Sequence, residues 1–230
     1  ETTVLRFRNF AADNMSSVEL TRLGDVWLLT MKGSEIKPGV FENRFNPTFV
    51  AELNEALDTV ENTAGTTALV TTSTGKIFCN GLDLTWLGEN TDQTATFLAS
   101  FEKLLHRMLF FPVPTVAAIN GHAFAGGCMF SIAHDYRVMR EDRGFICLNE
   151  IDLGMTLTEG MNALVKSKID PRVLRAMLLQ GHRSVPVLTF VIFNFFTFFC
   201  SLLLYTRSYL HTTFLVCMVV VIFILRLVVM

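Results

Sequence analysis

Charged residues are scarce in this chain of 230 residues, and they are almost absent from its last 46. Asp, Glu, Lys and Arg make up 17% of the sequence, against about 25% in an average soluble domain. All 21 acidic residues and all 14 glycines lie at or before Gly181, and only Arg207 and Arg226 are basic beyond Ser184. The shortage of charge therefore divides the chain into an ordinary soluble body and a hydrophobic tail.

The overall composition excludes two classes of protein. With 51% hydrophobic residues the chain has enough apolar surface to form a core, which excludes disorder. Its net charge of −2 shows no basic excess of the kind that nucleic-acid binding requires, so we expect no nucleic-acid partner.

Paired cysteines are also lacking. None of the five forms a CxxC pair or a metal-ligand spacing with the five histidines, so we expect no metal site and a reducing compartment. No GxxxxGK[ST] phosphate loop is present. The cysteines are interpreted as small buried hydrophobes: Cys79, Cys128, Cys147, Cys200 and Cys217.

The two ends of the chain are expected to lie outside the fold. Residues 1–14 have no apolar segment typical of a secretory signal, and Met15 would make a natural start, so we interpret them as a leader. In the tail, residues 185–205 carry no charge and as a helix would be about 32 Å long, close to the thickness of a bilayer. Residues 214–230 form a second apolar run that contains Arg226. Two interpretations stay open: a membrane hairpin that brings membrane contact, or translated non-coding sequence.

Between these ends, strand and helix patterns alternate, which predicts an α/β fold. Residues 32–46 have the composition of a loop. The predicted strands are 18–20, 26–31, 68–72, 116–119, 136–139 and 145–148, and the predicted helices are 47–60, 91–111, 126–133 and 171–180.

Two segments place a glycine-rich turn between a strand and a helix or helical turn: KIFCNGLDL at 76–84 and INGHAFAGGC at 119–128. Glycine allows a ligand to approach the backbone closely, and amides at a helix N-terminus point outward with a partial positive charge. Two such turns that face each other could donate two N–H groups to one oxygen, as in an oxyanion hole.

Glu150 is the candidate for a catalytic base. Phe145, Ile146, Leu148 and Ile151 surround it in a stretch that otherwise has the character of a core, so burial should raise the pKa of its carboxyl group. A buried glutamate with a structural partner is the alternative. The run from Asp135 to Arg143 is interpreted as a solvated turn, and Asp83 could cap a helical turn.

Residues 15–183 resemble the crotonase (enoyl-CoA hydratase/isomerase) superfamily, through KIFCNGLDL, NGHAFAGGCMFSIAHDYRVMREDRG and FICLNEIDLGM, which occur in the family's order. The resemblance implies a spiral of ββα units in a core domain at 15–184, here truncated before the C-terminal helices and followed by a hydrophobic helical tail at 185–230. It implies an acyl-CoA substrate, whose coenzyme A is part of the substrate, and no separate cofactor.

The site residues implied by the resemblance are taken position by position. Glu150 would be the catalytic glutamate, and the backbone amides of Leu82 and Gly126 would form the oxyanion hole. The remaining candidates would contact substrate: Arg44, Asn80, Gly81, Asp83, Leu84 and Gly127.

Missing acids favour one reaction. Hydratases of the family carry a second glutamate where this chain has Met129, and dienoyl-CoA isomerases carry a further acid where it has Thr158. A Δ3,Δ2-enoyl-CoA isomerase with one base, serving peroxisomal β-oxidation, is therefore the favoured prediction, although no SKL-type terminal signal is present. An inactive or membrane-tethered acyl-CoA-binding relative is the second hypothesis, and a 2-enoyl-CoA hydratase is the third. The family's trimer is not expected without its C-terminal helices.

Overall fold

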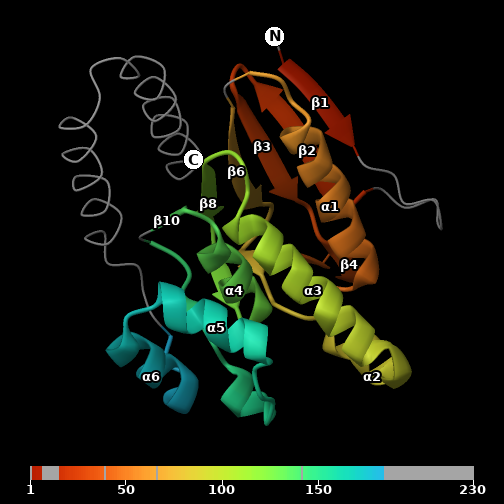
Figure 1. Ribbon diagram of the computed structural model, residues 1–230. Helices are drawn as coiled ribbons and strands as arrows, with labels where there is room; N and C mark the ends of the chain where they lie inside the picture. Colours follow the sequence, from red (N-terminus) through yellow and green to blue (C-terminus); the bar gives the residue numbers. More distant parts are fainter. Residues whose placement is uncertain (1, 7–15, 39, 66, 141, 184–230) are drawn as a thin grey trace, which may run out of the picture.

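The largest element of the computed structural model is a six-stranded sheet, in a structure that describes residues 2–6, 16–38, 40–65, 67–140 and 142–183 (Figure 1). Three strands at one side are antiparallel, and the strands that follow β3 are parallel to it. In spatial order they are β1 (Thr2–Arg6), β2 (Val18–Leu23), β3 (Val26–Met31), β6 (Ala68–Ser73), β8 (Thr115–Ile119) and β10 (Tyr136–Met139).

Two smaller sheets complete the β-structure. The first runs in the order β11 (Ile146–Cys147), β9 (His122–Phe124) and β7 (Ile77–Cys79), all parallel. The second is the hairpin β4 (Ser34–Lys37) and β5 (Val40–Glu42). Each strand of the three-stranded sheet leads directly toward one of the segments that the sequence singled out, so this sheet positions the candidate site.

Helices α1 (Pro47–Glu61), α3 (Thr94–Leu109) and α4 (Gly126–Ala133) cover one face of the large sheet (Figure 1). The Asn46 side chain accepts a hydrogen bond from the Phe49 amide at 2.9 Å, and Pro47 occupies the first turn, so α1 begins where its sequence predicts. Every residue of α4 is buried. The other helices are α2 (Leu84–Glu89), α5 (Glu159–Lys168) and α6 (Pro171–Gln180), with short 3₁₀ turns η1 (Thr91–Gln93) and η2 (Glu150–Leu153).

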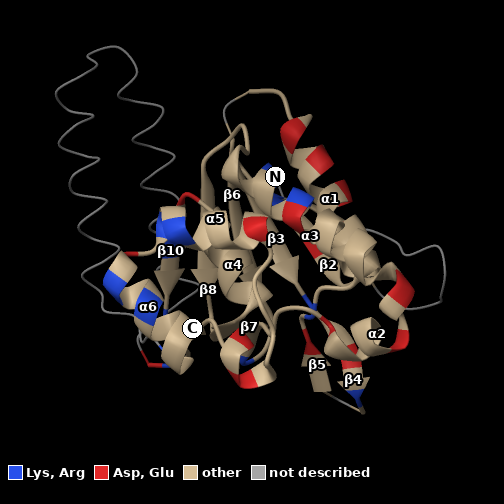
Figure 2. Cartoon of the chain, turned by 60° about the horizontal axis from the view of Figure 1, so that its bottom comes forward, with Lys and Arg blue, Asp and Glu red and all other residues tan. Residues whose placement is uncertain are grey.

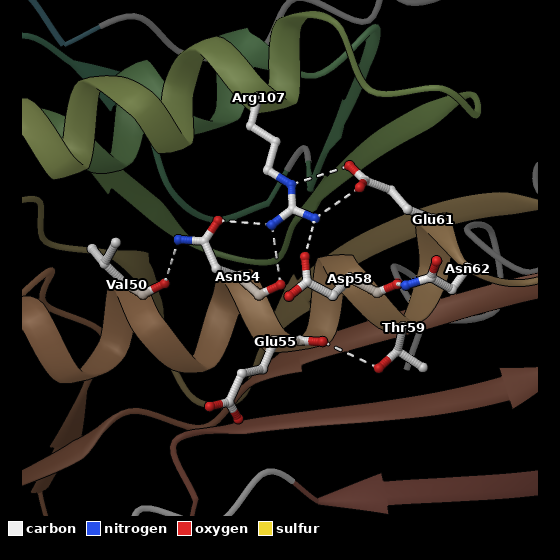
Figure 3. A network of polar contacts seen from close by, with 8 residues as sticks. All are labelled: Val50, Asn54, Glu55, Asp58, Thr59, Glu61, Asn62 and Arg107. Carbon is white, nitrogen blue, oxygen red and sulfur yellow. Dashed lines mark hydrogen bonds and ion pairs between the residues drawn. The ribbon is translucent and has the colours of Figure 1, made fainter.

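Arg107 connects α3 to α1 through a network of polar contacts (Figure 3). Its guanidinium donates to Asn54 Oδ1 at 2.9 Å and to the Asn54 carbonyl at 3.1 Å. It also forms ion pairs with Asp58 at 2.6 Å and Glu61 at 2.9 Å. Because these contacts lie along successive turns of α1, they hold α3 against α1, and α3 carries Phe101 into the core.

Several predicted elements are confirmed and others need correction. The predicted bounds of 26–31, 126–133, 136–139 and 171–180 agree with β3, α4, β10 and α6. Residues 32–46 are not simply a loop, because β4 and β5 pair within them. The long helix predicted at 91–111 begins with a 3₁₀ turn and ends at Leu109, and α5 was not predicted at all.

The predicted leader is wrong for residues 2–6. Thr2–Arg6 pair antiparallel with β2 along its length, so the backbone groups at that edge of the sheet are satisfied by this segment. The solvated turn predicted at 135–143 is also wrong in part. Asp135 Oδ2 accepts from the Thr115 amide at 2.8 Å. Arg137 belongs to β10 and donates to the carbonyls of Ile132, in α4, and of His134, which follows it.

The predicted hydrophobic helical tail at 185–230 lies outside the described residues. Within the described ranges, none of the helices combines the length and the apolar character that a membrane span needs.

Candidate active site

The two glycine turns lie in direct contact. A Cβ atom placed on Gly81 would lie 3.0 Å from the Gly126 nitrogen and 3.0 Å from the Ala125 Cβ atom. A Cβ on Gly127 would lie 2.4 Å from the carbonyl oxygen of Cys79. Side chains at these positions would therefore force the turns apart, which explains why both segments use glycine here. The predicted pairing of the two turns is confirmed.

The first turn is aligned by residues 42–45, which run beside it. The Asn80 amide donates to the Asn43 carbonyl at 2.9 Å, and the Phe45 amide donates to the Gly81 carbonyl at 2.8 Å. The Asp83 amide returns a hydrogen bond to the Phe45 carbonyl at 2.8 Å. In this pattern the Leu82 amide points away from residues 42–45, and no described residue accepts a hydrogen bond from it.

The second turn has an unusual backbone conformation. Ala125 has φ 48° and ψ −119°, and it is the one non-glycine residue with positive φ among those described. Its amide donates to the Cys147 carbonyl at 2.8 Å, which ties the turn to β11. Gly126 follows as the first residue of α4, so its amide has no carbonyl partner within the helix. Strain of this kind costs about 1–3 kcal/mol and is found at functional sites.

A pocket of about 80 Å³ opens beside these two amides. Its inner end is buried, its outer rim is formed by exposed apolar side chains, and Glu150 is the one ionisable group among the described residues that line it. The lining residues are Asn80, Leu82, Leu84, Leu98, Phe101, Ala125, Gly126, Met129, Asn149, Glu150, Leu153, Met155, Thr156, Leu157, Thr158 and Met161.

Glu150 begins η2, directly after Asn149, and the residue is 9% exposed. Its Oε2 atom is buried and has no hydrogen-bond partner among the described residues. Burial raises the pKa of this carboxyl group, and a hydrogen bond from its own backbone opposes that shift only in part. The Oε2 atom is therefore available to a proton of a ligand, and no side chain among the described residues donates a hydrogen bond to it.

The other predicted substrate residues divide into two groups. Asn80, Leu84 and the residues that carry the two amides line the pocket, whereas Arg44, Gly81, Asp83 and Gly127 do not. Asp83 caps α2 instead, accepting a hydrogen bond from the Trp86 amide at 3.1 Å, as the alternative for this residue predicted. Arg44 forms an ion pair with Glu42 at 2.8 Å.

His122 lies in β9 against the rings of Phe124 and Phe145, outside the pocket. Burial lowers the pKa of its imidazole, and the positive charges of Arg183 and Arg143 lower it further. Among the described residues no group of three His, Cys, Asp or Glu side chains could hold a metal ion.

Sequence reasoning missed most of the apolar wall. The segment from Leu153 to Thr158 borders the pocket, and α3 contributes Leu98 and Phe101. Glu102 of α3 holds that segment, because it accepts hydrogen bonds from the Thr158 hydroxyl and from the Gly160 amide. The apolar spacing of α3 identified Phe101 as a core residue, but nothing in that spacing distinguishes core from pocket.

The fold and the site define a class of protein: an α/β protein with the crotonase-like fold, in which residues of two glycine turns and Glu150 line an apolar pocket. The model of the family described as enoyl-CoA hydratase/isomerase matches residues 36–186. The chain belongs to the enoyl-CoA hydratase/isomerase family.

Individual relatives agree with this assignment. Enoyl-CoA delta isomerase 3 of Arabidopsis thaliana is 37% identical over 173 residues, which cover 72% of this chain and 69% of the relative. The peroxisomal enoyl-CoA delta isomerase 2 of the same plant is 34% identical, with 72% and 70% covered. Among solved structures, an enoyl-CoA hydratase from Mycobacterium ulcerans is 26% identical, with a TM-score of 0.66 and coverage of 74% of this chain and 72% of that one.

Proposed function

We propose that this protein is a Δ3,Δ2-enoyl-CoA isomerase. The observation that carries the proposal is the pocket itself: a single buried carboxyl group, whose Oε2 atom has no hydrogen-bond partner among the described residues, lies in an apolar cavity beside two adjacent glycine turns. The similarity to two plant enoyl-CoA delta isomerases supports the same activity.

In this proposal the Glu150 carboxylate removes a proton from C2 of a 3-enoyl-CoA. The electron pair of the broken C–H bond moves toward the thioester carbonyl, and negative charge develops on its oxygen. The amides of Leu82 and Gly126 donate to that oxygen, and one such donor is typically worth about 10²–10³ in rate. Glu150, now protonated, returns the proton to C4, and the double bond moves from C3=C4 to C2=C3.

The reaction needs only one ionisable group, which fits the composition of the pocket. Addition of water would need a second group to activate the water molecule, and Met129, which is buried in the pocket wall, cannot do so. The raised pKa of Glu150 suits its two roles, because the group must both accept and release a proton near neutral pH.

The test is Glu150→Gln, with Glu89→Gln at the exposed end of α2 as the control. We expect kcat for isomerisation of a 3-enoyl-CoA to fall about 10²–10⁴-fold, the usual contribution of a general base, while a saturated acyl-CoA binds as tightly as before. In the unaltered protein kcat/KM should fall at acid pH, since the base must be ionised, and it should do so above the ordinary glutamate pKa of 4.5.

Three outcomes would contradict the proposal. Turnover by Glu150→Gln within about tenfold of the unaltered protein would remove Glu150 from the mechanism. Binding of acyl-CoA without any turnover would favour an inactive relative. Rapid hydration of crotonyl-CoA would favour a hydratase.

We also propose that the protein acts in the peroxisome, in the oxidation of unsaturated fatty acids, because two of its relatives are named as peroxisomal isomerases. A fluorescent protein fused to the N-terminus of the full chain should co-localise with a peroxisomal marker. A diffuse cytosolic signal would contradict this location.

A further inference from the structure

Glu42, at the end of β5, is the centre of a hydrogen-bond cluster next to the first glycine turn. Its Oε2 atom accepts from Arg44 Nε at 2.9 Å and from an Arg44 terminal nitrogen at 2.8 Å. The same oxygen accepts from Asn80 Nδ2 at 2.5 Å. The Glu42 side chain is 15% exposed, so these contacts are largely shielded from solvent.

Asn80 links this cluster to the pocket. Its backbone amide donates to the Asn43 carbonyl, its side chain donates to Glu42, and it also lines the cavity. It directly precedes Gly81, whose Cα lies so close to the second turn that a Cβ atom there would be 3.0 Å from the Gly126 nitrogen. Glu42 therefore fixes the side chain of Asn80, the residue that precedes the glycine of the first turn. In Figure 2 β5 and α2 lie at the same end of the molecule, in agreement with the pairing of residues 42–45 with this turn.

A carboxylate is suited to this position for two reasons. An ionised oxygen can accept several hydrogen bonds at once, and bonds of this charge-assisted kind are about twice as strong as neutral ones. The ion pair with Arg44, in which two guanidinium nitrogens donate to Oε2, also neutralises the negative charge. Without that neutralisation, an anion beside the first turn would oppose the negative charge that develops on the thioester oxygen.

We propose that Glu42 is a positioning residue for the reaction: through Asn80 it holds the first glycine turn so that the Leu82 amide meets the thioester oxygen. This inference rests on the proposed function. Glu42 itself does not line the pocket and touches no reacting atom. Its contribution is to reduce the freedom of a turn whose glycine would otherwise allow many conformations.

The test measures the thioester carbonyl directly. A saturated acyl-CoA labelled with ¹³C at the carbonyl is bound to the unaltered protein and to Glu42→Ala, Glu42→Gln and Asn80→Ala, and the carbonyl stretch is recorded by infrared difference spectroscopy. Glu55→Ala, an exposed glutamate on α1, is the control. Thermal unfolding, kcat and KM are measured for each variant.

We expect the bound carbonyl to absorb at a lower frequency than the free thioester in the unaltered protein, and to shift back toward the free value in Glu42→Ala. In that variant kcat should fall about 10- to 100-fold, as for other displacements of a catalytic group, with a smaller change in KM. Glu42→Gln keeps one acceptor and should be intermediate. Combined with Asn80→Ala, Glu42→Ala should add little, because both act through one contact.

An unchanged carbonyl frequency and kcat in Glu42→Ala and Glu42→Gln would overturn the inference, and so would fully additive effects of Glu42→Ala and Asn80→Ala. If Glu42→Ala does not fold, Glu42→Gln decides by the same two readouts. A bound carbonyl with no frequency change in the unaltered protein would overturn the proposed oxyanion hole as well, which distinguishes the two failures.

Discussion

Replacing Gly81 by alanine should impair the site more than the fold. Gly81 has φ +87°, a conformation that L-residues rarely adopt, and its new Cβ atom would lie 3.0 Å from the Gly126 nitrogen. Ordinary contacts of a Cβ atom begin at 3.4 Å, so the two turns must separate by several tenths of an ångström. The atom that has to move carries one of the two proposed oxyanion donors.

The magnitude follows from two separate terms. The backbone strain of alanine at positive φ costs about 1–3 kcal/mol of unfolding free energy. For the reaction, a displacement of 1 Å costs about 10²-fold in rate. The few tenths of an ångström imposed on the Gly126 amide should therefore lower kcat by about tenfold, and by more if the donor is lost.

Gly75 provides a matched control for the first term. It has φ +83° in the turn between β6 and β7, and a Cβ atom there would have no neighbour within 4 Å. The loss of unfolding free energy in Gly75→Ala should therefore come only from the backbone strain of alanine at positive φ. Urea unfolding of both variants gives the loss of stability, and steady-state isomerisation of a 3-enoyl-CoA gives kcat.

Gly81→Ala should lose at least as much stability as Gly75→Ala, because it adds a contact between the turns to the same backbone strain. Only Gly81→Ala should lose about tenfold or more in kcat. Equal kcat values for the two variants would refute the reasoning, because the contact between the turns would then have no effect on the reaction.

Two further predictions concern stability. His134 is fully buried between the Phe130 carbonyl and the Thr71 hydroxyl, and burial lowers its pKa from 6.5 to about 4. The unfolded chain therefore binds a proton at His134 more readily than the folded chain does. The contribution of His134 to the free energy of unfolding is complete above pH 6.5 and is lost as the pH falls toward 4. Urea unfolding at pH 7 and pH 5 should show this loss of stability in the unaltered protein and not in His134→Gln. Arg107→Lys should lower the free energy of unfolding, measured in urea, by about 1–2 kcal/mol. The reason is that an ammonium group cannot replace the several guanidinium donors to Asn54, Asp58 and Glu61. Equal stability of the variant and the unaltered protein would show that the network in Figure 3 does not fix α3 to α1.

Local patterns predicted much of the fold. The helix α4 and the strands β3 and β10 agree with their predicted bounds, because apolar periodicity and the flanking glycines act over a few residues. β1 and the β4–β5 hairpin were missed, since they are defined by their pairing with other strands rather than by an apolar pattern of their own. The burial of Glu150 followed from its apolar neighbours in the sequence.

The roles of the candidate substrate residues could not be predicted from the local sequence. Asp83 and Asn80 lie in the same motif, yet Asp83 caps α2 and Asn80 lines the pocket. Only the path of the chain after Gly81 decides between these roles. Arg44, another candidate substrate residue, does not line the pocket, and its guanidinium forms an ion pair with Glu42.

The amino-acid sequence by itself determined the alternation of strands and helices, the two glycine turns and the placement of one glutamate in an apolar stretch, because each depends on neighbouring residues. The tertiary structure decided which groups meet. Gly81 and Gly126 touch, and Glu42 reaches Asn80, only when three parallel strands and the segment 42–45 are brought together. Those contacts join residues that are tens of positions apart, and their distances depend on packing of the whole core, which no local pattern in the chain encodes.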